Sequence, residues 1–141
     1  MNIRFMNAYA QVPTRGSDYA AGYDLYAAVG EEVTIWPHET VKVTTGLAME
    51  LPKNTFGAIF ARSGLATKQG LRPANCVGVI DEDYRGEVIV ALHNDGNDPK
   101  TIQPGDRIAQ LVIIPYLTVD FVEADIDDTA RGADGFGSSG R

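Results

Sequence analysis

The sequence contains little cysteine and no long apolar run, and each absence excludes some classes of protein. Cys76 is the single cysteine among 141 residues, so no disulfide can form within the chain and a paired-cysteine metal motif is excluded. No apolar run is long enough to cross a bilayer, and the first five residues lack the apolar centre of a signal peptide. We therefore expect a cytoplasmic protein that does not bind a membrane.

Clusters of positive charge are also lacking. The sequence has 12 Lys and Arg residues against 19 Asp and Glu residues, a formal net charge of −7. A protein that binds a nucleic-acid backbone needs a basic patch to neutralise the phosphates. The charge balance therefore argues against a nucleic-acid partner. It still allows a small phosphate ligand, which needs only a few local donors.

What the sequence does contain is typical of one all-β domain. Hydrophobic residues make up 44% and charged residues 22%, the balance of a globular chain with a core. Glycine and proline recur at short intervals between segments rich in Val, Ile, Thr, Tyr and Phe. Residues 87–93 and 108–114 are apolar on nearly both faces, so we expect two strands buried in a sandwich or barrel.

Two regions depart from the strand pattern. Residues 63–70 begin with a capping serine, contain helix formers and end at Gly70, which predicts the one short helix of the fold. From residue 125 onward the chain is first acidic and then rich in glycine and serine. We expect a β domain over residues 1–124 and a mobile C-terminal arm over residues 125–141.

Five short segments form an ordered set along the chain. They are Ala21-Gly22-Tyr23-Asp24-Leu25-Tyr26-Ala27-Ala28, Arg62-Ser63-Gly64-Leu65-Ala66, Asn75-Cys76-Val77-Gly78-Val79-Ile80-Asp81-Glu82-Asp83-Tyr84-Arg85-Gly86, Gly105-Asp106-Arg107-Ile108-Ala109-Gln110-Leu111 and the stretch from Arg131 to Gly140. In this order and at these spacings they resemble the five motifs of the trimeric dUTP pyrophosphatase (dUTPase) family.

The resemblance covers the chain from about Ala21 to its C-terminus. It implies a distorted jelly-roll or β-barrel, assembled as a homotrimer with active sites at the subunit interfaces. It also implies Mg²⁺-dependent hydrolysis of dUTP to dUMP and pyrophosphate by attack of water on the α-phosphate. In the cell this reaction limits uracil incorporation into DNA and supplies dUMP for thymidylate synthesis.

The third segment carries the residues that the resemblance links to hydrolysis and to the sugar. Asp81 is implied to activate the attacking water, and a carboxylate within hydrogen-bond reach of a water can act as a general base. Tyr84 is implied to pack beneath the deoxyribose and to leave no room for a 2′-hydroxyl. The structural alternatives are an acidic turn at Asp81 and a core or cross-strand tyrosine at Tyr84.

The same segment is expected to recognise the base. We expect a hairpin with residues 77–80 as one arm and residues 87–92 as the other. By resemblance Asn75, Gly78 and Val79 lie at its uracil end, where backbone groups pair with the base and discriminate against cytosine.

The second and fourth segments are implied to bind phosphate. Arg62, Ser63 and Gly64 lie at the start of the predicted helix, and a helix N-terminus is a natural anion site. Ser63 could equally be only a helix cap. Gln110 interrupts an apolar strand, and a buried amide must find hydrogen-bond partners. The resemblance gives Gln110 a phosphate contact, and a bond to a neighbouring strand is the alternative.

The first segment supplies the implied metal contact. Asp24 matches the family aspartate that holds Mg²⁺ through coordinated water, which suits a metal bound mainly by substrate phosphates. Without that resemblance, an aspartate after Gly-Tyr is more often a turn residue.

The last segment is implied to close over the site. Arg131 can clamp a terminal phosphate, Phe136 can stack on uracil, and the backbone of Gly137 and Ser138 can donate to phosphate oxygens. Asp134 departs from the family, which usually has glycine there, and its charge should weaken closure. A terminus with no fixed position is the alternative.

At two further positions the sequence departs from the family pattern without the loss of a catalytic group. Ala61 stands where proline is common, and Cys76 stands where glycine is common. Because Cys76 has no base beside it in the sequence, we expect a small core residue rather than a nucleophile.

Three other functions remain open at this point. A related dCTP deaminase shares the fold, but the Arg-Ser-Gly segment lacks the extra polar residues that deamination requires. A non-catalytic binding platform would leave the full set of motif residues unexplained. A purely structural jelly-roll would leave Gln110 and Phe136 without a role.

Overall fold

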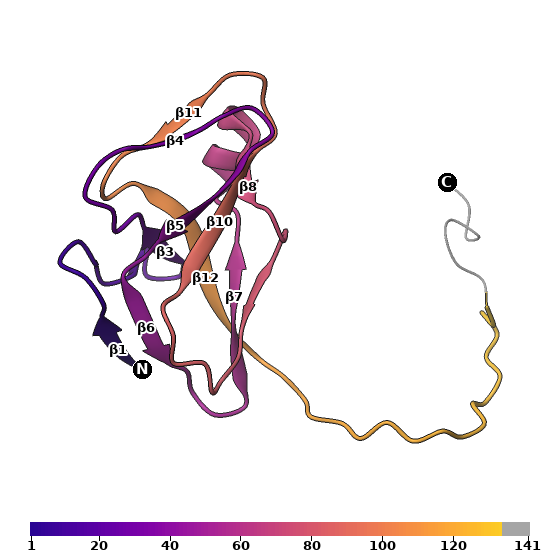
Figure 1. Ribbon diagram of the computed structural model, residues 1–141. Helices are drawn as coiled ribbons and strands as arrows, with labels where there is room; N and C mark the ends of the chain where they lie inside the picture. The colour runs from indigo at the N-terminus through magenta and orange to yellow at the C-terminus, as the bar shows by residue number, and fades with distance from the viewer. Residues whose placement is uncertain (134–141) are drawn as a thin grey trace.

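The computed structural model describes residues 1–133 and contains short strands with one helical segment (Figure 1). In chain order the elements are β1 (Asn2–Phe5), β2 (Thr14–Arg15), β3 (Tyr23–Tyr26), β4 (Val33–Ile35), β5 (Thr40–Thr44), β6 (Leu47–Glu50), β7 (Thr55–Phe60), η1 (Leu65–Gln69), β8 (Leu71–Pro73), β9 (Gly78–Ile80), β10 (Ile89–Asn94), β11 (Lys100–Ile102) and β12 (Arg107–Pro115). The all-β prediction is confirmed.

The strands pair antiparallel in four sheets, and most neighbours in a sheet are distant in sequence. The largest sheet has the order β2-β3-β12-β7-β9, and a second has the order β5-β10-β8. The pairs β1-β6 and β11-β4 complete the body. Strands that are consecutive in sequence thus often lie in different sheets, which is the connectivity of a jelly-roll-like fold. Within residues 1–133 the sheets have open edges and do not form a closed barrel.

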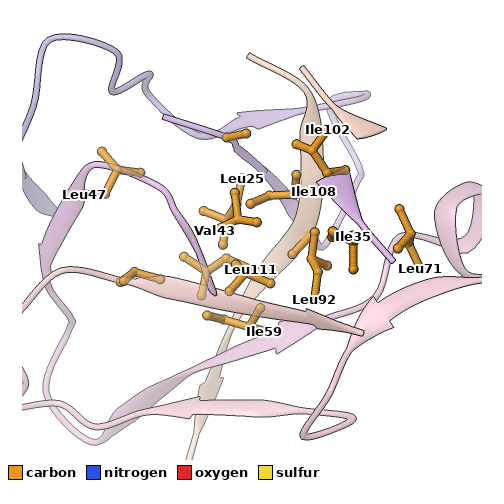
Figure 2. Close-up of a cluster of buried hydrophobic side chains, with 14 of the residues drawn as sticks. Leu25, Ile35, Val43, Leu47, Ile59, Leu71, Leu92, Ile102, Ile108 and Leu111 are labelled. Carbon is orange, nitrogen blue, oxygen red and sulfur yellow. The ribbon is translucent and has the colours of Figure 1, made fainter. Parts of the chain in front are cut away.

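The core lies between these sheets, and Figure 2 shows its side chains converging from several of them. Its largest apolar members have almost no exposed surface: Leu25, Ile35, Val43, Leu47, Leu71, Val88, Val90, Leu92, Ile102, Ile108 and Leu111. Burial of this apolar surface is the main force that holds the short strands together.

The two strands predicted from apolar runs are both present. β12 spans the predicted residues 108–114 with one more residue at each end. β10 starts two residues later than predicted and is not buried on both faces. Val90, Leu92 and Asn94 are buried, whereas Ile89 is 42% exposed, because only one face of this sheet packs on the core.

The predicted hairpin in the third segment is wrong in its pairing. β9 pairs with β7, with Val79 opposite Ala58, and β10 pairs with β5 and β8 instead. β9 thus forms the edge of the largest sheet, whereas β10 is the central strand of a different sheet. The two arms therefore diverge, which leaves space between them.

The predicted helical segment is present. Ser63 and Gly64 are α-helical, and η1 continues the same stretch as a π-helix up to Gln69. Gly70 ends it in the left-handed conformation (φ 69°) with its N–H donated to the carbonyl of Leu65. Ser63 lies inside this helical stretch and no side chain caps η1, so the predicted capping role of Ser63 is wrong.

The chain after β12 runs away from the body as an extended tail (Figure 1). Residues 116–129 form no helix or strand, and Leu117, Phe121 and Ile126 are each at least 90% exposed. Apolar side chains this exposed are unusual on a chain with nothing to cover them. Within residues 1–133 there is no helix long and apolar enough to span a membrane.

Truncation of the core should be costly in a body of short strands that depends on apolar burial. We expect Leu92→Ala to lower the free energy of unfolding by about 2–5 kcal/mol, because Leu92 is fully buried in the centre of β10. Val12→Ala, at a side chain that is 57% exposed, should change it by less than about 0.5 kcal/mol. Urea denaturation of both variants measures this, and equal losses would contradict the assigned core.

Candidate active site

Strand β12 brings the polar residues of three segments together. Gln110 lies opposite Asp24 of β3 on one side and opposite Phe60 of β7 on the other. Its neighbours Ala109 and Leu111 are buried in the core. Because successive side chains of a strand alternate between faces, Gln110 and Asp24 lie on the outer face of the sheet.

A hollow of about 470 Å³ lies on this outer face, and we call it the arginine pocket. Its lining comprises Gly16, Ala20, Ala21, Gly22, Asp24, Phe60, Arg62, Ser63, Gly64, Arg107, Gln110 and Val112. The residues that the sequence linked to phosphate and metal, from Asp24 through Gly64 to Gln110, thus line one pocket. Their proximity follows from strand pairing, because Arg62 comes just after β7.

Asp24 holds two guanidinium groups in this pocket. Its Oδ1 accepts from Arg62 Nε at 2.8 Å, and its Oδ2 lies 3.3 Å from Arg107 Nη1. Arg62 Nη1 also donates to the carbonyl oxygen of Arg107 at 3.2 Å. The side chain of Asp24 is only 14% exposed, so these contacts fix the direction of both arginines.

Arg107 was not among the site residues predicted from the sequence. Its place in the fourth segment, as the first residue of β12, was the available signal. With two cations against one carboxylate, the side chains of the pocket carry a net positive charge. That balance suits a ligand with several negative charges.

Gln110 is partly buried and its amide is satisfied within the chain. Its Nε2 donates to the carbonyl oxygen of Ala61 at 2.8 Å, so the predicted bond to a neighbouring strand is present. The side-chain oxygen lies against Gly22, where any Cβ would overlap it. The glycine therefore makes room for this amide in the pocket.

A second hollow, of about 400 Å³, lies in the space where β9 and β10 diverge. Asp81, Tyr84, Val79 and Ile89 are among the residues that line it, and we call it the Asp81 pocket. Asp81 is exposed, so a water molecule can reach its carboxylate. The third segment thus gathers the predicted acid–base and sugar residues even though its arms do not pair.

Tyr84 has a fixed orientation in this pocket. Its hydroxyl donates to the carbonyl oxygen of Glu87 at 3.1 Å. A Cβ on Gly86 would overlap the ring and its hydroxyl oxygen, so glycine allows the ring to lie close to the backbone. Tyr84 is 44% exposed and is therefore not a core tyrosine.

The other residues of the third segment lie near one another at the start of β9. The side chain of Asn75 is exposed and lies beside Gly78. Cys76 is exposed and has a left-handed backbone (φ 61°), which explains why glycine would suit this position. The expectation of a core cysteine is therefore wrong.

The two pockets share no lining residue, so one chain does not bring all the predicted residues together. Arg131 lies in a turn of the tail near the end of the described residues. Phe136, Gly137 and Ser138, like the departure at Asp134, lie outside residues 1–133.

Metal binding is limited by the donors present. Within residues 1–133 no three His, Cys, Asp or Glu side chains are grouped to hold a metal ion. Both oxygens of Asp24 already pair with arginines, which does not suit a direct ligand. The arrangement fits an ion held chiefly by phosphates, with Asp24 in contact through coordinated water.

One ion pair away from both pockets shows a clear electrostatic effect. Arg72 donates to Asp95 with Nε and Nη2, at 2.5 and 3.1 Å. This hydrogen bonding lowers the pKa of Asp95 and raises that of Arg72. His93 Nε2 lies 3.4 Å from Asp95 and its Nδ1 lies 2.9 Å from Thr40 Oγ1, so these groups tie β8 to β10 and β5.

The fold and the two pockets define a jelly-roll-like β protein with a divided polar site, and comparison with known proteins gives the family. The dUTPase family model matches residues 8–140. The deoxyuridine 5′-triphosphate nucleotidohydrolase of Desulfitobacterium hafniense is 52% identical over 132 residues, which are 92% of this chain and 87% of that protein. The chain belongs to the dUTPase family.

Solved structures agree with this assignment. The dUTPase of Staphylococcus bacteriophage 80alpha with dUpNHpp matches with a TM-score of 0.88 and 29% identity, over 99% of this chain and 98% of that chain. A mutant dUTPase from phage phi11 of S. aureus, whose structure reveals the details for the coordination of a structural Mg(II) ion, matches with a TM-score of 0.80 and 25% identity, over 89% of this chain and 96% of that chain.

The contact between Gly22 and Gln110 gives a test of the arginine pocket. Gly22→Ala should displace the Gln110 side chain and lower the affinity for inorganic pyrophosphate about tenfold, or roughly 1.4 kcal/mol. Gly16→Ala is the matched control, because it lines the same pocket and its new methyl group would meet open space. Isothermal titration calorimetry should separate the two, and equal affinities would contradict the assigned role of Gln110.

Proposed function

We propose that this protein hydrolyses dUTP to dUMP and pyrophosphate by attack of water on the α-phosphate. The observation that carries the proposal is that a chain of the dUTPase family places its predicted site residues in two separate pockets. One pocket offers a carboxylate beside a fixed tyrosine, and the other offers two arginines and an amide. These are the groups needed to activate water and to hold a polyphosphate.

Asp81 accepts a proton from the attacking water and orients it toward the α-phosphorus. A bond forms between the water oxygen and phosphorus, and the bond from phosphorus to the bridging oxygen of the pyrophosphate breaks. The negative charge of the departing pyrophosphate is bound by Arg62, Ser63, Gly64 and Gln110. The ion pair with Asp24 holds the Arg62 guanidinium in a fixed direction. No covalent intermediate with the enzyme is required.

Mg²⁺ is the cofactor that this donor set suits. When bound, it neutralises phosphate charge and lowers the cost of pyrophosphate departure. Asp24 would hold it through coordinated water, as its paired oxygens suggest.

The Asp81 pocket selects the nucleoside. Asn75, Gly78 and Val79 lie at one end of β9, where backbone groups can pair with uracil and would leave a group unpaired with cytosine. Tyr84 forms a fixed wall under the sugar, so a 2′-hydroxyl would overlap the ring.

A homotrimer joins the two pockets across subunit interfaces. The support for this is that the pockets share no residue within one chain and that the tail carries exposed apolar side chains. We propose a body over residues 1–124 and an arm over residues 125–141 that closes over the site. Arg131 and Ser138 of the arm would bind phosphate with the backbone of Gly137, and Phe136 would stack on uracil.

Replacement of the proposed base should stop the reaction. We expect Asp81→Asn to lower the rate of pyrophosphate release from dUTP by at least about a hundredfold while the nucleotide still binds, because the amide cannot accept the proton. Asp83→Asn, which removes the same charge two residues away, should keep most of the rate. Unchanged turnover in Asp81→Asn would refute the assigned base.

Sharing of sites between subunits can be tested by mixing two inactive variants. Asp81→Asn and Arg62→Ala chains, unfolded and refolded together in equal amounts, should recover about a quarter of the wild-type activity. A shared site is intact only where an Arg62→Ala chain supplies Asp81 and an Asp81→Asn chain supplies Arg62, and about a quarter of the interfaces have this combination. Each variant refolded alone is the control. No recovery in mixed trimers would mean that both pockets of a site come from one chain.

A further inference from the structure

The segment between β9 and β10, residues 81–88, carries both Asp81 and Tyr84 but belongs to no strand. Its internal bonds are short-range. Tyr84 N donates to the carbonyl of Asp81 at 3.1 Å and its hydroxyl to the carbonyl of Glu87 at 3.1 Å, and Arg85 Nη1 donates to the carbonyls of Glu82 and Tyr84 at 2.7 and 3.1 Å. Most of the segment is exposed. Contacts with the rest of the body must therefore hold the two functional side chains in place.

The first of these contacts is made by Glu82. Its Oε2 accepts from the backbone N–H of Asn54 at 2.7 Å and from the hydroxyl of Tyr116 at 3.3 Å. Tyr116 N in turn donates to the carbonyl of Asn54 at 3.1 Å. Glu82 thus binds the segment, at the residue after Asp81, to the turn before β7 and to the first residue of the tail.

Tyr116 is suited to act as a donor in this contact. Desolvation against the body raises the pKa of Tyr116, and the negative charge of Glu82 raises that pKa further. The hydroxyl therefore keeps its proton throughout the neutral pH range.

The second contact is made by Glu87 at the other end of the segment. Its Oε1 accepts from the backbone N–H of Gly46 at 2.9 Å. The carbonyl of the same residue accepts the hydroxyl of Tyr84. Glu87 therefore joins the tyrosine to the turn between β5 and β6 by one continuous path.

The backbone beside Glu87 is held independently of its carboxylate. Val88 N donates to the carbonyl of Leu47 at 2.7 Å, and the carbonyl of Val88 accepts both N and Oγ1 of Thr45, at 3.2 and 2.6 Å. The Glu87 carbonyl that accepts the Tyr84 hydroxyl and Val88 N belong to one peptide group. This group has two anchors, Leu47 through Val88 N and Gly46 through the Glu87 carboxylate. Loss of the Glu87 side chain removes the second anchor and should loosen the Tyr84 segment without unfolding the strand that follows.

We propose that Glu82 and Glu87 are positioning residues with separate tasks: Glu82 places Asp81 for attack, and Glu87 places Tyr84 as the wall that excludes a 2′-hydroxyl. The inference rests on the proposed function. Rejection by overlap needs a rigid wall, and a general base needs a fixed distance to its water, so each task depends on a different contact.

Steady-state kinetics with dUTP and UTP separate the two tasks. Glu82→Ala should lower kcat for dUTP about tenfold and leave the ratio of kcat/KM for dUTP over UTP unchanged. Glu87→Ala should lower that ratio about tenfold, with a smaller change in kcat for dUTP. Glu31→Ala is the matched control, because Glu31 is exposed and distant in sequence from Glu82 and Glu87, and it should alter neither quantity.

The conservative variants distinguish positioning from charge. Glutamine keeps the acceptor oxygen, so Glu82→Gln and Glu87→Gln should restore most of kcat and of the selectivity ratio, respectively. The carboxylate of Glu87 also faces the Asp81 pocket. If Glu87→Gln behaved like Glu87→Ala, the positioning role of Glu87 would be overturned. The separate tasks would be overturned if both alanine variants lost kcat equally and kept the selectivity ratio unchanged.

Amide hydrogen exchange gives a readout that does not depend on turnover. Exchange at Asn54 should accelerate in Glu82→Ala only, and exchange at Gly46 should accelerate in Glu87→Ala only, because each loses its acceptor. Protection that survives in both variants would overturn the two contacts. If the wild-type protein released no pyrophosphate from dUTP, the proposed function would fail while this exchange result still decided the two contacts.

Discussion

The two-sided pairing of β12 is the constraint on which the rest of the structure depends. β12 is hydrogen-bonded to β3 on one edge and to β7 on the other, and the register places Gln110 between Asp24 and Phe60. A slip of one residue would turn Gln110 toward the core and Leu111 toward solvent. Burial of Ile108, Ala109 and Leu111 therefore also fixes the arginine pocket.

From this register the pocket follows with few additional bonds. Arg62 leaves the end of β7 and meets Asp24, and Arg107 begins β12 and meets the other oxygen of the same carboxylate. The pairing of both arginines with one partly buried aspartate fixes their direction before any ligand arrives. Such preorganisation lowers the cost of holding a polyphosphate.

The second pocket depends on a different feature, which is the failure of β9 and β10 to pair. β9 completes the edge of the large sheet, whereas β10 lies between β5 and β8. The segment that bridges them is left outside both sheets, where Asp81 and Tyr84 can face a ligand. Its position then depends on the contacts of Glu82 and Glu87 with distant turns.

The fold class and much of the arginine pocket could be predicted from the sequence. The apolar run of residues 108–114 gave a buried strand, and its polar interruption marked Gln110 as a residue that needs partners. The ordered motifs indicated the family, which the match over residues 8–140 confirms.

Other features were beyond sequence reasoning because they depend on distant contacts. The arms of the expected hairpin are adjacent in the chain, but each finds a better partner in another sheet. Ser63 is a residue type common at helix caps, yet it lies inside the helical stretch and no side chain caps η1. Arg107 received no role from the sequence, because only the pairing of β12 with β3 places it beside Asp24.

Pyrophosphate release by the purified wild-type protein tests the central claim most directly. It would be measured with dUTP, UTP, dCTP and dTTP at equal concentrations, with and without Mg²⁺. The account predicts rapid release from dUTP with Mg²⁺ and little from the other three nucleotides. A folded protein that released none from dUTP, or that used UTP equally well, would contradict it.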